Sequence, residues 1–368
     1  MPRSHKGLVS IVVPVYNAEE HLTATLNCLE RQTYNKIEIL LIDDGSKDTS
    51  AAICESFARR DCRFQYVEQE NAGAGAARNN GLDRASGEFL MFLDADDLFE
   101  ADFVERLVLA IKKNESDVAV CMADWFKDGA KDVERSPLNK GLSVKKGTFS
   151  PCDFSADFFQ AVTSHPWDKL YRAAHIRSQG LRYQNLRFSN DSYFVLMAML
   201  TSSRITWIED VLVHYRVGQG TSLRDKMYLS PLCDLRKFDA LRLEISTREE
   251  AELPGLMASL DAYTVNTLFA SYAFLASQSE SACAEFRKHF VQVSLPKWMS
   301  CSGTSLNLAS AKLKFKYWCL TRVSPKGMAW AVSPYGRNGL RTADKKTWLN
   351  VYARLIPARF MGLLDNSE

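Results

Sequence analysis

The sequence predicts an α/β protein: a mostly parallel β-sheet with helices on both faces, followed by a mainly helical C-terminal region. Over residues 7–123, short apolar segments alternate with segments of helical periodicity, and short links join them. Such alternation is typical of parallel strands connected by crossover helices. Beyond residue 230, helical spacing dominates the sequence.

Each strand of the alternating part is predicted from a short apolar run that is often β-branched. In chain order the runs are Ser10–Val15, Ile37–Ile42, Phe64–Val67, Phe89–Asp94 and Val118–Met122. Helices are predicted between and after them at Glu19–Gln32, Ser50–Arg60, Ala76–Arg84 and Asp102–Lys113. The first helix has Leu22, Leu26 and Leu29 on one face, and Ser46 or Asp48 is expected to cap the second.

The following segment is less regular. The polar stretch Lys127–Gly147 is interpreted as a loop or hairpin, and His165–Arg172 is dense in large functional side chains. A helix is predicted at Asn190–Leu200, and two strands are predicted at Ile205–Ile208 and Val211–Tyr215.

Polar side chains follow three of the predicted strands at their carboxyl ends. They are Asn17 after the first strand, Asp43 and Asp44 after the second, and Asp94 and Asp96 at the end of the fourth. Because ligands bind outside the carboxyl ends of strands in open α/β sheets, we expect these side chains to form one site. Two aspartates at positions i and i+2 can both face a hard divalent cation.

A glycine-rich loop, Gly73–Arg78, opens the third helix of the alternating part. It lacks the third glycine of the dinucleotide-binding fingerprint and follows the third strand instead of the first. A glycine loop at a helix start with an arginine in its first turns still suits an anion.

Charge and cysteine content restrict the classes of protein. The net charge is +2, but residues 283–368 carry 14 Lys and Arg against 4 Asp and Glu, which favours an anionic partner for this part. The nine cysteines are scattered without a Cys-x-x-Cys motif, so we expect a reducing, cytoplasmic setting without disulfides or a zinc site. No signal peptide is expected, and Ala262–Ser279 is interpreted as a buried helix.

Residues 9–107 resemble the catalytic domain of family 2 glycosyltransferases, which have the GT-A fold. The motifs that carry the resemblance are Val-Ser-Ile-Val-Val-Pro-Val-Tyr-Asn at 9–17, Gln-Thr-Tyr at 32–34, Glu-Ile-Leu-Leu-Ile-Asp-Asp-Gly-Ser-Lys-Asp at 38–48, Asn-Ala-Gly at 71–73, Ala-Arg-Asn at 77–79 and Phe-Leu-Asp-Ala-Asp-Asp at 92–97. A looser match continues to residue 225. We therefore predict a catalytic domain at 1–225, with a nucleotide-sugar-binding half at 7–123 and an acceptor-side half at 124–225, and a helical, basic region at 226–368.

The resemblance implies a role for each matching position. Residues implied to bind the nucleotide sugar are Pro14, Tyr16, Asn17, Asp44, Asn71, Gly73, Arg78, Asp94, Trp167, Lys169 and Arg216. Within this set, Asp44 would accept the N3–H of uracil or thymine, Asp94 would hold the ribose, and Arg78 would reach toward Asp94 and the diphosphate. Asp43 would order its turn.

Asp96 is implied to bind a divalent metal ion, Mn²⁺ or Mg²⁺, with His214 as a further metal ligand or a structural residue. Asp97 has two interpretations: it makes a water-mediated contact in the same site, or it caps the following helix. Inversion at the sugar requires a base for the acceptor hydroxyl. Family members often present Glu-Asp for this role, and this chain has Asn190-Asp191 at the matching position. Asp191 is therefore the candidate base, and the alternative is that Asp191 is a helix N-cap.

The resemblance implies an inverting, metal-assisted hexosyltransferase that uses a UDP-sugar or dTDP-sugar. The acceptor would be a glycan or a lipid-linked molecule in bacterial surface polysaccharide or oligosaccharide synthesis. Two alternatives are a sugar nucleotidyltransferase and a non-catalytic nucleotide-sugar-binding protein. A nucleotidyltransferase requires a Gly-rich basic loop after the first strand, where this chain has Pro14–Asn17.

Aromatic residues alternate with lysines and arginines in the C-terminal region, and Thr347–Ile356 has an apolar face at helical spacing. One interpretation is an interfacial anchor on the inner face of the plasma membrane, near a lipid-linked acceptor. Another is a helical domain that packs on the catalytic domain or on a second copy of the chain. No nucleic-acid-binding module is recognised.

Overall fold

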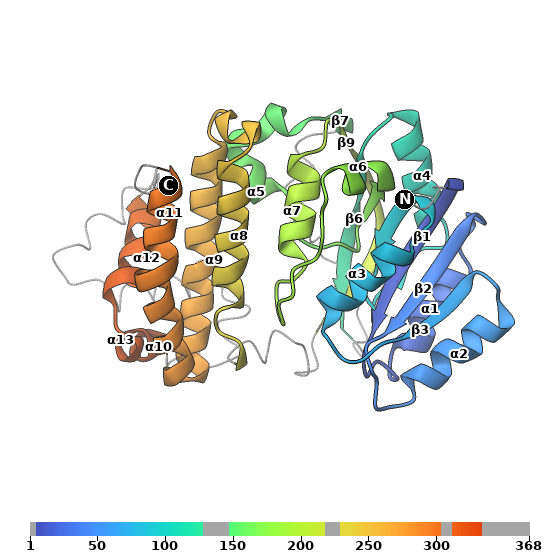
Figure 1. Cartoon of the computed structure of the whole chain (residues 1–368), viewed down its shortest axis with the longest axis horizontal. Coiled ribbons are helices and arrows are strands. Elements are labelled where there is room, and N and C mark those ends of the chain that lie inside the picture. Colours follow the sequence, from blue (N-terminus) through green and yellow to red (C-terminus); the bar gives the residue numbers. More distant parts are fainter. Residues whose placement is uncertain (1–4, 128–146, 218–228, 303–310, 333–368) are drawn as a thin grey trace. The chain divides into compact units, whose positions relative to one another are not determined.

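The computed structural model describes residues 5–127, 147–217, 229–302 and 311–332 (Figure 1). The chain divides into two compact units. One consists of Met1–Phe154 and Gln160–Gln219, and the other consists of Ser155–Phe159 and Gly220–Glu368. The boundary predicted at residue 225 lies outside the described residues, as does most of the loop predicted at Lys127–Gly147.

The first unit is built on one nine-stranded sheet. Its strands are β1 (His5–Val15), β2 (Ile37–Asp43), β3 (Phe64–Glu68), β4 (Gly87–Phe92), β5 (Leu98–Phe99), β6 (Val118–Phe126), β7 (Gly147–Phe149), β8 (Lys169–Arg172) and β9 (Ile205–Arg216). The order is β3-β2-β1-β4-β8-β6-β9-β5, and β7 pairs with β9. Strands β1 to β4 are parallel, as predicted, whereas β8 is antiparallel to both β4 and β6, so the complete sheet is mixed.

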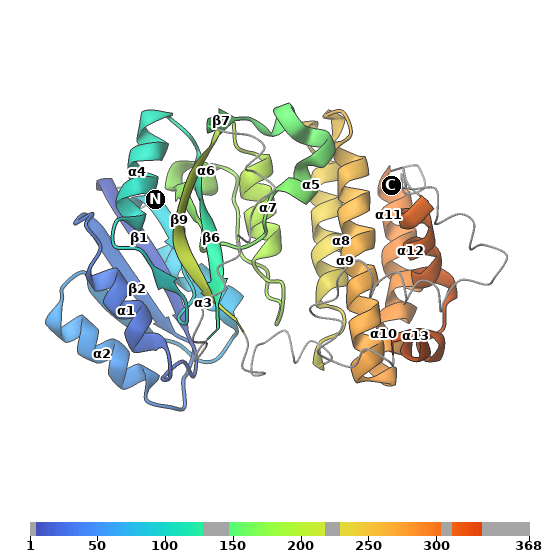
Figure 2. The ribbon, with the colours of Figure 1, turned by 180° about the vertical axis from the view of Figure 1, so that it is seen from behind.

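Helices cover both faces of this sheet. They are α1 (Leu22–Glu30), α2 (Ser50–Arg60), α3 (Ala74–Arg84), α4 (Phe103–Lys113), α6 (Ala173–Ser178) and α7 (Ser192–Leu200). A 3-10 helix, η2 (Pro151–Asp157), and the short helix α5 (Phe158–Ala161) include residues 155–159, which belong to the second unit. Helices α1, α2 and α4 share one core with alternate residues of β1, among them Val9, Ile11 and Val13. The helix α3 packs on β1 and β2 and lies in front of the sheet in Figure 1, whereas α1 is in front in Figure 2.

The predicted elements of the alternating part agree closely with the structure. Helix α2 has the predicted bounds Ser50–Arg60, and α4 differs by one residue at its start. The two strands predicted at Ile205–Ile208 and Val211–Tyr215 form a single strand, β9. Its pairing with β6 shifts in register between Trp207 and Val211, so the polar residues between them are accommodated as an irregularity.

The second unit is helical, as predicted. Its helices are α8 (Cys233–Ser246), α9 (Leu256–Gln278), α10 (Glu280–His289), α11 (Leu295–Ser302), α12 (Ala311–Arg322) and α13 (Pro325–Val332), with a 3-10 helix, η4 (Glu249–Glu252), and a π-helix, η5 (Phe290–Ser294). The long helix α9 packs against α8, α10, α12 and α13. It includes the segment predicted as a buried helix, and Leu268 and Tyr272 on it are fully buried.

Within the described residues, none of the helices has the length and hydropathy that a membrane crossing requires. The amphipathic helix predicted at Thr347–Ile356 lies outside the described part of the chain.

Candidate active site

Asp44 organises the loops at the carboxyl ends of β2 and β3. Its Oδ1 accepts hydrogen bonds from the Gln69 side chain at 2.7 Å and from the main-chain N–H of Ala72 at 2.8 Å. Its Oδ2 accepts one from the N–H of Gly73 at 2.8 Å, where φ is +91°. A carboxylate offers about four acceptor positions, so three bonds leave roughly one for a ligand.

Two neighbouring side chains fix the shape of these loops. Asp43 accepts hydrogen bonds from the N–H of Ser46 at 2.9 Å and from the hydroxyl of Tyr66 at 3.1 Å, which orders the turn as predicted. Asn17 has a φ of +47°, and its Oδ1 accepts a hydrogen bond from the N–H of Lys47 at 2.8 Å. The loops after β1 and β2 are therefore tied to each other.

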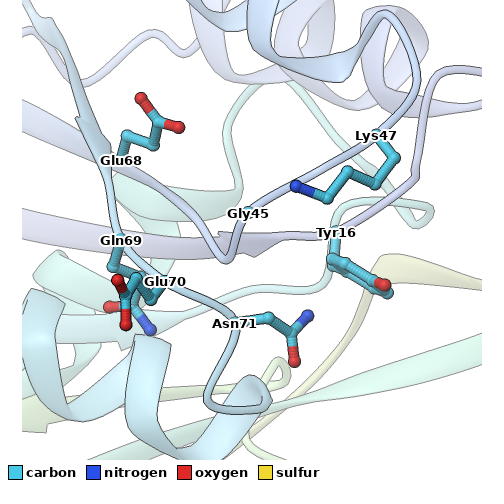
Figure 3. A pocket seen from close by; sticks show the side chains of 7 residues that line it. All are labelled: Tyr16, Gly45, Lys47, Glu68, Gln69, Glu70 and Asn71. Carbon is cyan, nitrogen blue, oxygen red and sulfur yellow. The ribbon is translucent and has the colours of Figure 1, made fainter.

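These loops surround a pocket of ≈ 430 Å³ (Figure 3). Its lining residues are Tyr16, Gly45, Lys47, Glu68, Gln69, Glu70 and Asn71. Figure 3 shows Glu68, Gln69 and Glu70 on the β3 side and Tyr16 and Lys47 on the opposite side. Tyr16 is 51% exposed, and the volume lies in the range of small-molecule sites.

A second cluster is centred on Arg78 of α3. Its Nη2 donates a hydrogen bond to Oδ1 of Asp94 at 2.6 Å, and its Nη1 donates one to Oδ1 of Asn190 at 2.8 Å. The guanidinium is buried. Burial lowers the pKa of Arg78, but its interactions with Asp94, Tyr183 and Asp191 together outweigh this, and the pKa lies above its ordinary value. The predicted contact between Arg78 and Asp94 is present.

Asp191 stands at the N-terminus of α7, directly after Asn190. Its side chain makes no capping hydrogen bond to this helix, so the alternative role as a side-chain N-cap is not realised. Its carboxylate lies 3.5 Å from the Ser192 hydroxyl, which donates to it. Its charge reaches both Arg78 and His165. The half-buried carboxylate is thus placed beside the Arg78 cluster.

The loop Asp94–Asp97 concentrates negative charge. Desolvation and the charge of Asp94 raise the pKa of Asp96 to about 6, although the residue reaches the surface. Burial, followed by the charges of Asp96 and Asp94, raises the pKa of Asp97 well above its ordinary value. Arg216 donates its main-chain N–H to Asp97 Oδ1 at 3.0 Å and its Nε to the carbonyl oxygen of Asp96 at 2.8 Å.

His214 lies between two carboxylates. Its Nδ1 is 2.6 Å from Asp124 and its Nε2 is 3.0 Å from Glu100. Both ring nitrogens therefore have protein partners, and metal ligation by His214 would require one of them to be exchanged. Among the residues that the structure describes, no group of three or more His, Cys, Asp and Glu is placed to hold a metal ion.

Trp167 and Lys169 lie beneath the surface of the site. Trp167 is 1% exposed and Lys169 is 0% exposed. The Lys169 ammonium pairs with Asp168 at 2.5 Å and donates to the carbonyl oxygen of His165 at 2.8 Å. The His165 ring stacks on Trp167 with ring centroids 4.8 Å apart, and Trp167 stacks on Tyr215 at 5.5 Å. His165 and Tyr215 are the half-buried members of this stack.

Sequence reasoning missed several residues of the site. Lys47 and Gln69 line the pocket, and Asn190 was recognised only as a departure from an acidic residue. His165 belonged to the dense segment His165–Arg172 but received no role. Its signal was its position two residues before a tryptophan in that segment. Pro14, which was predicted to bind the nucleotide sugar, lies in β1 opposite Ile42 of β2.

The sequence pattern of "Glycosyl transferase family 2" matches residues 10–172, which hold Asp44, Arg78, Asp94 and Asp96. Residues 10–172 therefore form a glycosyltransferase family 2 domain. It is 34% identical over 213 residues to the "Putative glycosyltransferase EpsH" of Bacillus subtilis, which covers 57% of this chain and 60% of EpsH. It is 32% identical over 224 residues to "Glycosyltransferase GlyA" of Streptococcus pneumoniae, which covers 59% of this chain and 31% of GlyA.

Solved structures of two glycosyltransferases share the fold of this chain. Residues 1–349 of TarS from Staphylococcus aureus, in complex with UDP-GlcNAc, align with a TM-score of 0.60 at 21% identity, over 95% of this chain and 90% of that one. The mannosyltransferase PcManGT from Pyrobaculum calidifontis, in complex with GDP-Man and Mn²⁺, aligns with a TM-score of 0.52 at 16% identity, over 100% of this chain and 90% of that one. The predicted fold class is confirmed.

Proposed function

We propose that this family 2 glycosyltransferase inverts the anomeric centre of a UDP-sugar as it transfers the sugar to a hydroxyl of a glycan or lipid-linked acceptor. The observation that carries the proposal is the arrangement around Arg78. The buried guanidinium binds Asp94 on the donor side and Asn190 on the other, next to Asp191. Asp94, the predicted ribose contact, and Asp191, the predicted base, thus lie on two sides of the Arg78 guanidinium.

The donor nucleoside is assigned to the pocket of Figure 3. An exposed Tyr16 suits stacking on a base, and the remaining acceptor position of Asp44 suits the N3–H of uracil or thymine. TarS is solved with UDP-GlcNAc and with UDP, which supports a UDP-sugar. Pro14 and Asn17 are assigned to the nucleotide side of the site, as are Asn71 and Gly73, which both donate hydrogen bonds to Asp44.

Asp191 is assigned as the base that takes the proton from the acceptor hydroxyl. A free carboxylate is required for this step, and that of Asp191 makes no capping bond to α7. Trp167 and Lys169 act indirectly by holding the segment with His165, and Arg216 lies beside the Asp94–Asp97 loop, where it would neutralise diphosphate charge.

Asp96 is assigned to a divalent cation, Mn²⁺ or Mg²⁺. The surroundings fit a hard cation: the carboxylate of Asp96 is exposed beside Asp94, and Asp97 Oδ2 is buried without a hydrogen-bond partner in the described part of the chain. When bound, such an ion supplies Lewis-acid stabilisation of the leaving diphosphate. The neighbour PcManGT was solved with Mn²⁺.

The biological setting is proposed from the relatives. TarS of Staphylococcus aureus, 25% identical over 265 residues, is named a poly(ribitol-phosphate) β-N-acetylglucosaminyltransferase. We place this chain in bacterial surface polysaccharide or oligosaccharide synthesis, on the cytoplasmic side of the membrane. The basic aromatic C-terminal region is proposed to contact that membrane surface.

The test is a screen of purified protein for hydrolysis of UDP-, dTDP- and GDP-sugars, with and without Mn²⁺. We expect release of UDP from a UDP-sugar, dependence on the cation, and loss of both in Asp96→Ala. The variant Asp191→Asn is expected to lower turnover by about 10²- to 10⁴-fold. Asp83→Asn, on the exposed side of α3, is the matched control and is expected to behave as wild type.

The same screen, extended by a reaction with UTP and a sugar phosphate, separates the alternatives. A sugar nucleotidyltransferase would release pyrophosphate from UTP and a sugar phosphate. A non-catalytic binding protein would bind UDP without turnover of any sugar nucleotide. Equal rates in wild type and Asp96→Ala would overturn the assignment of Asp96.

A further inference from the structure

Asp191 is placed by a loop, and both ends of that loop are hydrogen-bonded to one helix, α3. We define the base loop as residues 183–191, between α6 and α7. The N–H of Gln184 donates to the carbonyl oxygen of Asn190 at 3.2 Å, so the two ends of the base loop are joined. Whatever fixes these two ends therefore fixes Asp191.

Consecutive residues of α3 hold both ends. Asn79 makes a reciprocal pair of hydrogen bonds with the main chain of Tyr183: its Nδ2 donates to the carbonyl oxygen at 2.9 Å, and its Oδ1 accepts from the N–H at 2.9 Å. Arg78 donates to the Asn190 side chain at 2.8 Å. The first end is thus held by two bonds to Asn79, and the second end by one bond to Arg78.

Close packing completes the contact. The first turn of α3 contains Gly75, which is buried against the base loop. A Cβ at this position would collide with the carbonyl oxygen of Gln184 and lie 3.2 Å from Cβ of Asn190. At Gly75 the base loop therefore lies directly on the helix, without room for a side chain between them.

We propose that Asn79 is a positioning residue for the catalytic base, because its paired hydrogen bonds with Tyr183 set the place of the base loop and hence of Asp191. The inference deepens the proposed function and depends on it. The same helix carries Arg78, which binds Asp94. A single rigid helix thereby sets the distance between the donor side of the site and the base.

The test compares Asn79→Ala, Asn79→Asp and Asp83→Ala. Asn79→Ala removes both bonds to Tyr183, and we expect the turnover number to fall by about 10- to 100-fold, because a displacement near 1 Å of a reacting group has this effect. The affinity for UDP, measured by calorimetry, is expected to stay within about twofold. Asn79→Asp keeps the acceptor for the Tyr183 N–H and is expected to give an intermediate turnover number.

Asp83→Ala is the matched control. Asp83 lies one turn further along α3 and pairs with Arg182, which precedes the base loop. The Arg182 side chain is 50% exposed and that of Asp83 is 58% exposed. Exposed ion pairs contribute little to the stability of a protein. We expect wild-type turnover from this variant.

Amide hydrogen exchange provides a readout that needs no substrate. In Asn79→Ala, exchange of the Tyr183 and Gln184 amides should accelerate about tenfold or more, while the strands of the sheet stay protected. Unchanged turnover or unchanged exchange in Asn79→Ala would overturn the inference. If wild type neither binds UDP nor releases it from a sugar nucleotide, while exchange still accelerates in the variant, the proposed function fails and the placement of the loop by Asn79 stands.

Discussion

Arg78 and Asp94 form a hydrogen-bonded ion pair, with Nη2 of the arginine 2.6 Å from Oδ1 of the aspartate. The two side chains come from different elements, α3 and the loop after β4, and are 7% and 29% exposed. Through its Nη1, the same guanidinium also binds Asn190. The planar guanidinium carries several N–H donors in a fixed fork, so it can bind both partners at once. A lysine ammonium at position 78 would lack this geometry.

Replacing Arg78 with lysine should therefore retain the charge and lose one of the two contacts. We expect at least a tenfold lower turnover number and a loss of about 1–3 kcal/mol in the free energy of unfolding, because a buried polar group is left without a partner. Steady-state kinetics and urea denaturation measure the two effects. Arg84→Lys, on the exposed end of α3, is the control. A variant that matches wild type in both measurements would contradict the proposed role of the fork.

Replacing Asp44 with asparagine tests the loop anchor. The amide would present a donor to one of the main-chain N–H groups of Ala72 and Gly73, which now donate to the carboxylate. We expect a loss of about 1–3 kcal/mol in the free energy of unfolding, together with weaker binding of UDP. Thermal denaturation and calorimetric titration with UDP provide the measurements. Glu68→Gln, which lines the same pocket, is the control for the charge alone. Wild-type stability in Asp44→Asn would show that the anchor is dispensable.

Replacing Tyr16 with alanine or phenylalanine tests the pocket of Figure 3. The ring is 51% exposed, so neither change should disturb the core. If the base stacks on this ring, alanine should weaken UDP binding by about 1–3 kcal/mol, whereas phenylalanine should bind UDP nearly as well as wild type. Equal affinity of the alanine variant and wild type for UDP would place the base elsewhere.

The sequence predicted the parts of the fold that depend on local patterns. Helix α2 and the strands β1 to β4 follow from short-range periodicity and β-branched runs. It did not predict β8 (Lys169–Arg172), because this four-residue strand exists only through its antiparallel pairing with β4 and β6. Local sequence does not encode a pairing partner that is more than 40 residues away.

The candidate site was predicted in the same uneven way. Asp44, Arg78 and Asp94 stand in motifs, and the structure gives each of them polar partners in the site. The burial of Lys169 was not predictable, since lysine is normally exposed. Asp168 precedes it in the sequence, but only the folded chain shows that the two side chains pair in the interior. The contact between Asn79 and Tyr183 joins positions 104 residues apart, so only the folded chain shows it.

His165 gives the site a dependence on pH that can be measured as stability. Burial lowers the pKa of this imidazole below its usual 6.5, against the opposing charge of Asp168. The other charges that reach the ring are those of Lys169, Asp191 and Asp94. Because the folded-state pKa is depressed, the stabilising contribution is fully present above pH 6.5 and is lost as the pH falls through the folded-state pKa.

Replacing His165 with phenylalanine keeps an aromatic ring on Trp167 and removes the titration. Between pH 7.5 and pH 5, wild type should lose more of its free energy of unfolding than His165→Phe does, since only wild type must place a proton on a desolvated ring. Urea denaturation at several pH values measures the difference between the two proteins. His289→Phe, near the end of α10, is the control for a histidine elsewhere in the chain and should follow wild type. Parallel pH profiles of wild type and His165→Phe would mean that the imidazole is as well solvated in the folded protein as in the unfolded one.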